Sequence, residues 1–413
     1  MPALTGSAQP DPGHSSDRIG SLDVLRGIAL LGMFLVHFND HAAGGGSLDA
    51  IYRQTVALFF EERFWTMFGI LFGIGFAVQL RRADARGASF VPRYVRRLLA
   101  LAAFGVFTHA VLGYHVLLEY AAWGLPLLLV RRWPVRALLV ALVISAASWS
   151  IYSIARATTC VTARGETVCR AEMAEEIARI RAFRETNQRD EEAPNYPAVF
   201  AAHLRHMAWF YVQPYSFLPV NTLTLFLLGV IALRLGLLDE PQAHRPLIVA
   251  LIVFGAAAWA AEVWLVPPVD ELPSRSLIWE AVLGWSRMGF GLIRTMWLAF
   301  SYIGVVLLLV SYDPRWLRRL AAFGWTGRMA LTNYIVQVAI LDLAFSNYAL
   351  HLTPTPLQAL AGGLVLFAVD VAFSRWWLAR FRFGPLEWLW RSITYGRMQP
   401  WRLAPPAAEA PAV

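Results

Sequence analysis

IGSLDVLRGIALLGMFLVHFNDH, residues 19–41, indicates that this chain enters a membrane. The run is almost wholly apolar between Arg26 and His37, and its length matches the roughly 20 residues that a helix needs to cross a bilayer. Asp23 and Arg26 are three residues apart, so on a helix they share a face and can pair. His37 follows Arg26 by almost three whole turns, which places both side chains on one face about 16 Å apart. A titratable residue held so deep in a span indicates a functional site.

The composition of the whole chain agrees with a membrane protein. Of its 413 residues, 57% are hydrophobic and 15% are charged, whereas soluble domains average about 45–50% and 25%. The net charge of +8 does not indicate nucleic-acid binding, because the arginines cluster between apolar stretches. The two cysteines match no zinc motif, so no metal is expected. From the charge pattern, no nucleic acid is expected as a partner.

Ten apolar stretches are predicted to be transmembrane helices, since a lipid-exposed backbone must satisfy its own hydrogen bonds. They run roughly over residues 22–41, 64–81, 97–113, 115–131, 135–154, 216–236, 246–266, 290–311, 327–346 and 356–379. The third and fourth should form a tight hairpin. Gly69, Gly73 and Ala77 share one face of the second, where a neighbouring helix can approach closely. The expected fold is an all-α polytopic membrane protein, a bundle of about ten transmembrane helices.

Clusters of arginine follow every second predicted span. They come after the second, fourth, sixth and eighth spans and in the C-terminal tail, while the alternate loops lack dense clusters. The positive-inside rule assigns such loops to the cytoplasm. Both termini are therefore expected to be cytoplasmic, and the chain is expected to be a multi-pass protein of the bacterial cytoplasmic (inner) membrane.

Three parts are predicted along the chain. Residues 1–17 form a flexible cytoplasmic tail, residues 18–381 the helical bundle with an outer loop at 155–200, and residues 382–413 a cytoplasmic amphipathic helix with a flexible tail. Within the outer loop, residues 171–184 have a mixed-charge, helix-like pattern. Cys160 and Cys169, nine residues apart in the same loop, could form a small disulfide or remain two free thiols.

His37 is the leading candidate for catalysis. Histidine is the side chain most often used for proton transfer at neutral pH, and a histidine reached by substrate could take a proton from an acceptor hydroxyl or amine. Glu119 or Asp40 could orient the imidazole. The alternative is that His37 forms a hydrogen bond between helices or only marks the outer end of the span.

The pair at the start of the first span also admits two interpretations. Asp23 and Arg26 could anchor the helix at the membrane boundary. Alternatively, Arg26 could bind an anionic phosphate that enters from the cytoplasm, since a guanidinium forks onto phosphate oxygens.

Polar side chains recur at helical spacing in the ninth span. Asn333 and Gln337 are four residues apart, as are Thr326 and Ala330, and such a stripe joins helices more often than it contacts a substrate. Further on, RFGPLEWLWRSITYGRMQP predicts a short amphipathic helix begun by Pro385. It would serve as an anchor at the cytoplasmic interface or as a gate beside the donor entrance.

Four runs resemble the bacterial YeiB family: SLDVLRGIALLGM at 21–33, FGILFGIGFA at 68–77, TGRMALTNYIVQ at 326–337 and FGPLEWLWRSIT at 383–394. That family is grouped with the transmembrane acyltransferase superfamily, beside the lysosomal heparan-α-glucosaminide N-acetyltransferase and the acyltransferase-3 O-acetylases. The resemblance implies a bundle of about ten spans that passes an acyl group from cytoplasmic acyl-CoA to an acceptor within or across the membrane.

The resemblance to the acyltransferase-3 enzymes extends to the first span. Their first span carries an arginine, ten residues and an essential histidine, a spacing that Arg26 and His37 match. YeiB-like and heparan-acetylating relatives tend to carry asparagine at the position of His37. The residues expected to bind the donor are Arg26, Asp23, Asn333 and Arg328, and those expected to carry catalysis are His37, Asp40 and Glu119.

The function expected from the sequence is that of an integral membrane acyltransferase. Acyl-CoA, with acetyl-CoA as the expected form, is the donor, and the acceptor is a hydroxyl or amine of a sugar, envelope lipid or secreted metabolite. Membrane lipid is a further partner, and association into a homo-oligomer is left open. The alternative from another class is a transporter or exporter of a small metabolite that uses the buried polar residues as its pathway.

Overall fold

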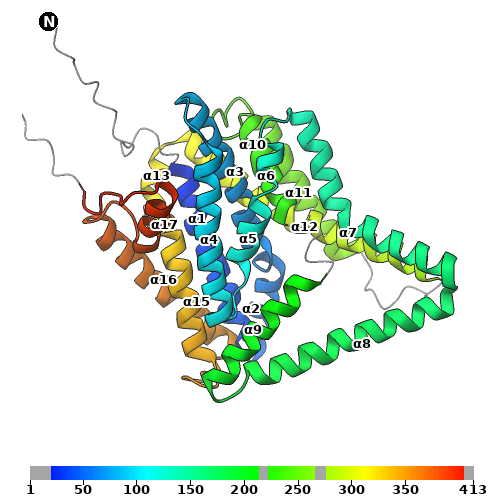
Figure 1. Ribbon diagram of the computed structural model, residues 1–413. Helices are drawn as coiled ribbons and strands as arrows, with labels where there is room; N and C mark the ends of the chain where they lie inside the picture. The colour runs from blue at the N-terminus through cyan, green and yellow to red at the C-terminus, as the bar shows by residue number, and fades with distance from the viewer. Residues whose placement is uncertain (1–19, 214–221, 266–275, 404–413) are drawn as a thin grey trace, which may run out of the picture.

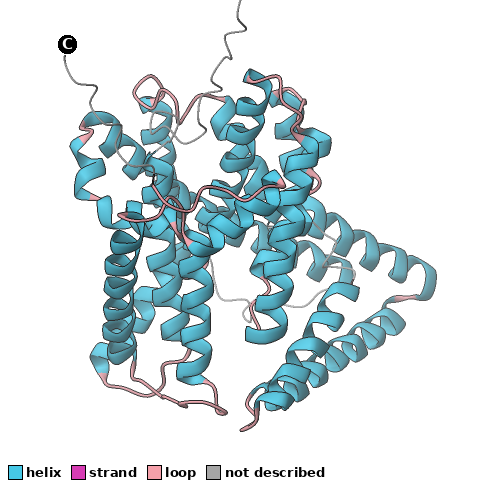
Figure 2. Cartoon of the chain, turned by 60° about the vertical axis from the view of Figure 1, so that its left-hand side comes forward, coloured by secondary structure: helices cyan, strands magenta, loops and turns pink. Residues whose placement is uncertain are grey.

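The computed structural model describes residues 20–213, 222–265 and 276–403, except the side chains of residues 262–265, 283–295 and 297. The helices gather into a bundle around α1 (Gly20–Asp40), and one long helical arm extends away from it (Figure 1). Figure 2 shows helices joined by loops, with no strand among the described residues. The one β-type pairing described is an isolated bridge between Phe381 and Arg402. The prediction of an all-α chain is confirmed.

The other described helices follow α1 in chain order. They are α2 (Ser47–Phe59), α3 (Arg63–Ala85), α4 (Val91–Leu112), α5 (Val116–Gly124), α6 (Leu127–Val130), α7 (Val135–Arg164), α8 (Glu166–Glu191), α9 (Tyr196–Val212), α10 (Thr222–Arg234), α11 (Arg245–Leu265), α12 (Leu277–Tyr312), α13 (Arg315–Arg319), α14 (Ala321–Arg328), α15 (Ala330–Phe345), α16 (Pro356–Leu378) and α17 (Pro385–Tyr395). Local signals set several ends: Thr355 and Gln358 form a capping box at α16, and Pro385 begins α17 as predicted.

Five helical segments of the described chain are long and apolar enough to cross a membrane. They are Gly20–Asp40, Ser47–Ala85, Val91–Leu112, Val135–Arg164 and Pro356–Leu378, and the bent pair Ala321–Arg328 with Ala330–Phe345 would be a sixth. Shorter apolar helices cover the other four predicted spans, at Val116–Val130, Thr222–Arg234, Arg245–Ala261 and Leu298–Tyr312. The described helices agree with the predicted bundle of apolar helices. The number of ten spans stays a prediction.

Glycines allow α3 and α10 to touch backbone to backbone, as the small-residue face of α3 predicts. A Cβ atom on Gly73 would lie 2.0 Å from the carbonyl oxygen of Phe226, and one on Gly229 would lie 2.1 Å from that of Ile70. Gly69 faces the side chain of Leu225 on the same side of the helix. Side chains larger than hydrogen at these places would hold the two helices apart.

A second glycine contact joins α1 to α14. A Cβ atom on Gly27 would lie 2.0 Å from the carbonyl oxygen of Phe323, and one on Gly327 would lie 1.8 Å from that of Asp23. The helix that carries the candidate catalytic residues is therefore fixed against α14 at the level of Asp23. This contact places α1 at the centre of the bundle.

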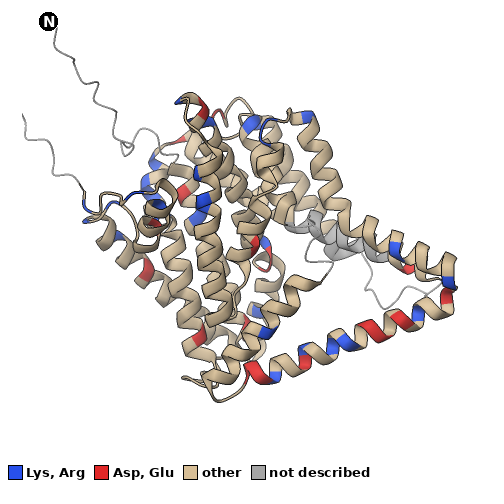
Figure 3. Ribbon diagram, viewed as in Figure 1, with Lys and Arg blue, Asp and Glu red and all other residues tan. Residues whose placement is uncertain are grey.

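The arginine-rich loops lie together at one end of the bundle, at the top of Figure 3. Arg81, after α3, donates to both carboxylate oxygens of Asp239, after α10, at 2.5 and 3.1 Å. Arg234 donates to the carbonyl oxygens of Arg131 and Trp133, which precede α7. Loops that the charge pattern assigned to a common side of the membrane are thus in direct contact. Which side that is stays a prediction.

The segment predicted as an outer loop at 155–200 is mostly helical and forms the arm. α7 continues to Arg164, and α8 extends the predicted helix of residues 171–184 to Glu166–Glu191. Gly165, with φ at 82°, forms the corner, a left-handed conformation that favours glycine. Cys160 and Cys169 form a disulfide across this corner, which decides between the two alternatives left open by the sequence.

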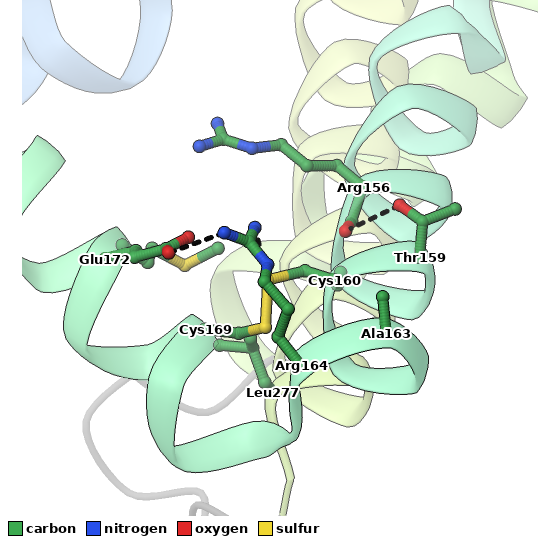
Figure 4. A pocket seen from close by; sticks show the side chains of 10 residues that line it. Arg156, Thr159, Cys160, Ala163, Arg164, Cys169, Glu172 and Leu277 are labelled. Carbon is green, nitrogen blue, oxygen red and sulfur yellow. Dashed lines mark hydrogen bonds and ion pairs between the residues drawn. A yellow bond between two sulfur atoms is a disulfide. The ribbon is translucent and has the colours of Figure 1, made fainter.

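Ion pairs hold the arm together around a small pocket. Arg164 lies 2.6 Å from Glu172 across the disulfide, and the pocket beside them has a volume of about 230 Å³ (Figure 4). Arg170 joins α8 to α12 through Glu280 at 3.0 Å. Arg170 also donates to Glu166 at 2.7 Å, and this hydrogen bond holds the pKa of Glu166 below its usual value. Glu166 therefore stays ionised. The ion pairs surround a small apolar cluster of Ala157, Cys169 and Leu277, and together they join α7, α8 and α12.

Candidate functional site

The C-terminal end of α1 brings together two of the predicted catalytic residues. His37 Nδ1 lies 3.6 Å from Asp40 Oδ2, an ion-pair distance that follows from their i, i+3 spacing. The His37 side chain is 30% exposed and that of Asp40 is 49% exposed, so both can be reached. An imidazole whose Nδ1 faces a carboxylate can accept a proton at Nε2, which is the arrangement of a general base.

Aromatic side chains from distant parts of the chain enclose this end of α1. The ring of Tyr114, between α4 and α5, meets the His37 imidazole edge-on at 5.5 Å. His41 stacks on Phe345, at the end of α15, at 4.6 Å. Gly113 ends α4 with φ at 79° and turns the chain so that Tyr114 faces α1. The sequence predicts the α4–α5 hairpin but not the contact of Tyr114 with His37.

Glu119 lies in a different polar group from His37. Thr222 Oγ1, at the start of α10, donates to Glu119 Oε1, and His115 Nε2 lies 4.0 Å from Glu119 Oε2. Within the described part of the chain, Glu119 has no hydrogen bond with His37. The side chain joins α5 to α10, and a catalytic part for it stays a prediction.

Next to Glu119 is a group of histidines that the sequence does not reveal as a unit. His109 Nε2 on α4 lies 3.2 Å from His206 Nδ1 on α9, and the rings of His109 and His115 are 5.8 Å apart. The two helices are 97 residues apart in sequence, so no local spacing predicts the contact. Among the described residues, no group of three or more histidine, cysteine or acidic side chains could hold a metal ion.

The N-terminal end of α1 carries the predicted ion pair. Arg26 Nη1 donates to Asp23 Oδ1 at 3.0 Å. The Asp23 side chain is 6% exposed, but that of Arg26 is 31% exposed and can reach a further ligand. Across from it, α3 presents Gly75, whose Cβ position would lie 3.8 Å from Arg26 Nη2. The pair leaves the guanidinium accessible, and both interpretations of it, anchor and phosphate contact, stay predictions.

The ninth predicted span is not one straight helix. α14 and α15 meet at Met329 with an 84° bend, because this residue leaves the helical conformation at φ −113° and ψ 32°. The prediction that Thr326 and Ala330 continue the stripe of Asn333 along one helix is therefore wrong. Instead, Asn333 Nδ2 crosses the break and donates to the carbonyl oxygen of Thr326 at 3.2 Å.

The two donor-binding candidates of this region lie at the break. Asn333 is 2% exposed and also donates to Ser374 Oγ on α16 at 3.0 Å, so its amide joins three helices. Arg328 lies in the last turn of α14, half-buried and next to the bend. The structure does not bring Asn333 or Arg328 into contact with Arg26 among the interactions described. Their part in donor binding stays a prediction.

Two family models match different parts of the chain. Residues 18–167 match the family model described as "Heparan-alpha-glucosaminide N-acetyltransferase, catalytic", and residues 232–397 match "Protein of unknown function (DUF418)". A Bacillus subtilis (strain 168) protein named "Uncharacterized protein YxaH" is 31% identical, over 94% of this chain and 97% of its own length. The chain belongs to the DUF418, YeiB-like family.

Two other relatives agree with this assignment. A Bacillus acidopullulyticus protein named "Uncharacterized 39.9 kDa protein in amylase 3'region" is 28% identical over 94% of this chain and 97% of its own length. "Uncharacterized protein YeiB" of Escherichia coli (strain K12) is 33% identical over 30% of this chain and 33% of its own length. No solved structure matches the chain. The resemblance to the YeiB family is confirmed.

In this DUF418 chain, the two C-terminal motifs meet through one half-buried carboxylate. Glu387 of α17 accepts hydrogen bonds from the backbone N–H groups of Leu331 and Thr332 at 2.7 and 3.1 Å, and from Thr332 Oγ1 at 2.6 Å. The first N–H groups of a helix have no partner within it, so Glu387 caps α15. The same Oγ1 accepts from the backbone N–H of Leu386 at 3.1 Å. This contact docks α17 and supports the anchoring interpretation of that helix.

Glu387→Ala is expected to destabilise this family member by removing the carboxylate that satisfies three donors. Each buried donor left without a partner costs about 1–3 kcal/mol, so a loss in melting temperature of roughly 4 °C or more is expected. Thermal unfolding in detergent, followed by tryptophan fluorescence, measures it. Glu240→Ala, at an exposed glutamate, should leave the melting temperature unchanged. Equal melting temperatures for the two variants would exclude the cap as a stabilising contact.

Proposed function

We propose that this protein is an integral membrane acyltransferase. It would move an acyl group, in the first instance acetyl, from acyl-CoA to a hydroxyl or amine of a sugar, envelope lipid or secreted metabolite. The observation that carries the proposal is the arrangement of α1, with a partly exposed Arg26 paired to Asp23 near one end and His37 beside Asp40 near the other. The match of residues 18–167, which include both pairs, to an acetyltransferase catalytic model supports it.

The orientation in the membrane follows from the arginines. We place the basic end of the bundle in the cytoplasm, with both termini there and ten spans in a bacterial cytoplasmic (inner) membrane. Arg26 then faces the compartment that holds acyl-CoA. His37 lies about 16 Å and Asp40 about 21 Å further along α1, towards the opposite side. The disulfide between Cys160 and Cys169 supports this orientation, since disulfides persist on the oxidising side.

The chemistry assigned to these residues is general-base acyl transfer. His37 takes the proton from the acceptor hydroxyl or amine at Nε2 while Asp40 holds the imidazole from the side of Nδ1. The acceptor oxygen or nitrogen then attacks the thioester carbonyl and the C–S bond breaks. Coenzyme A leaves as a thiolate, which takes the proton from the His37 imidazolium. The tetrahedral intermediate needs a hydrogen-bond donor for its oxyanion, and Asn39, two residues from His37, is the candidate that we propose.

Transfer of radiolabelled acetyl-CoA by the purified protein in detergent tests the proposal. The protein is incubated with and without a membrane extract, and extract components are separated for label. Label that moves into an extract component in a protein-dependent way supports the acyltransferase and isolates the acceptor for identification. Absence of both acetyl-CoA binding and label transfer would contradict the proposal.

One observation favours a transporter as the second candidate. The 84° break between α14 and α15 lies within an apolar span, and broken helices line the pathways of many transporters. Such transporters carry broken helices in paired repeats, whereas a single bent pair is found in the described part of this chain. Under this alternative, vesicles containing the protein would move a metabolite across the membrane, and no covalent acyl product would form.

A further inference from the structure

A half-buried arginine on α4 lies against the tryptophan of the C-terminal motif. The guanidinium carbon of Arg97 lies 3.6 Å from the centre of the Trp390 ring, a cation–π contact. Trp390 Nε1 in turn donates to the Arg97 backbone carbonyl oxygen at 2.8 Å. α17, which Glu387 docks on α15, thus fixes the position of the Arg97 side chain.

Two more guanidinium groups act on Arg97. The positive charges of Arg391, the residue after Trp390, and of Arg26 on α1 both act electrostatically on Arg97. Arg391 lies over the ring of Phe383 at 4.5 Å, and Arg26 donates to Asp23. Three arginines from α1, α4 and α17 are therefore gathered at the basic end of the bundle.

This gathering has a physical cost that a bound anion would offset. Within the described residues Arg97 forms no ion pair with a carboxylate, and the contact with Trp390 compensates its charge only in part. Like charges held close together away from bulk water repel, and a half-buried charge gains stability when it is paired. The aromatic contacts keep two of the guanidinium groups in place, so the site exists before a ligand arrives.

We propose that Arg26, Arg97 and Arg391 form a binding site for a phosphate group. Guanidinium groups match phosphate oxygens with paired hydrogen bonds, and two or three of them around one anion select phosphate over a singly charged carboxylate. Under the proposed function, on which this inference rests for its ligand, the phosphate belongs to coenzyme A. The headgroup of an anionic lipid offers the same chemistry. Arg97, Arg391 and Trp390 are residues that the sequence did not single out for binding.

Binding of coenzyme A to purified protein in nanodiscs of phosphatidylcholine tests the site by calorimetry. Arg97→Gln and Arg391→Gln should each weaken binding about tenfold or more, since each removes a charged hydrogen-bond donor. Arg93→Gln removes the same charge from an exposed position on α4 and should bind like the wild type. Melting temperatures identify any variant that does not fold. If Arg97→Gln does not fold, coenzyme A binding by Arg391→Gln tests the site instead.

A second measurement, with an anionic lipid in the nanodisc, distinguishes the two sources of phosphate. If coenzyme A does not bind but phosphatidylglycerol in the nanodisc raises the melting temperature in wild type and Arg93→Gln, and not in Arg97→Gln, the phosphate site stands and its ligand is a lipid. If coenzyme A and phosphatidylglycerol act equally on wild type, Arg97→Gln and Arg391→Gln, the site is overturned. Acetyl transfer by Arg97→Gln with an unchanged KM for acetyl-CoA would overturn the site and leave the acyltransferase intact.

Discussion

His37→Ala is expected to lower acyl transfer about 10²–10⁴-fold, the contribution that a positioned general base makes. Its imidazole, at the C-terminal end of α1, lies 3.6 Å from the Asp40 carboxylate and is partly exposed. Binding of coenzyme A should stay within twofold of the wild type, because the donor site lies near the other end of the helix. Label transfer and calorimetry on the same preparation measure the two quantities.

Three companion variants sharpen this prediction. His244→Ala, at a half-buried histidine of the basic end, should transfer label like the wild type. Asp40→Asn should lower transfer by less than His37→Ala, since it leaves the base in place and weakens only its orientation. His37→Asn introduces the residue that YeiB-like relatives tend to carry. Full transfer by His37→Ala or His37→Asn would show that His37 is a structural residue of α1 and not a base.

The sequence predicted α1 and its two polar pairs because they depend on local spacing alone. Asp23 with Arg26 and His37 with Asp40 are each three residues apart, so a helix brings each pair together whatever surrounds it. The arginine clusters likewise predicted which loops meet, since their common charge assigns them to one side of the membrane. These features needed no knowledge of how the helices pack.

Features that depend on packing were not predicted. The bend at Met329 has no proline that would have indicated it in the sequence. The Glu387 carboxylate that caps α15 comes from another helix, more than 50 residues later. The contact of His109 with His206 and that of Arg97 with Trp390 also join distant segments. Such contacts arise when helices settle against one another, so a hydropathy pattern does not contain them.

Gly327→Ala is expected to destabilise the protein more than any other single methyl addition on α14. The added Cβ would lie 1.8 Å from the carbonyl oxygen of Asp23 and 2.8 Å from the backbone nitrogen of Gly27. Backbone atoms cannot turn away as a side chain can, so α14 must move away from α1. Overpacking of this kind costs about 1–3 kcal/mol or more, and a clear fall in melting temperature is expected.

Gly324→Ala is the matched control, because it makes the same change one turn earlier on the same helix. There the nearest atom to the added Cβ is Val24 Cγ2 at 3.8 Å, an ordinary contact, and the gain in helix propensity should leave the melting temperature equal or higher. The displacement in Gly327→Ala also shifts Asp23, the partner of Arg26. Coenzyme A binding should therefore fall in Gly327→Ala and not in Gly324→Ala. Equal stability and equal binding of the two variants would show that α1 is not fixed by this backbone contact.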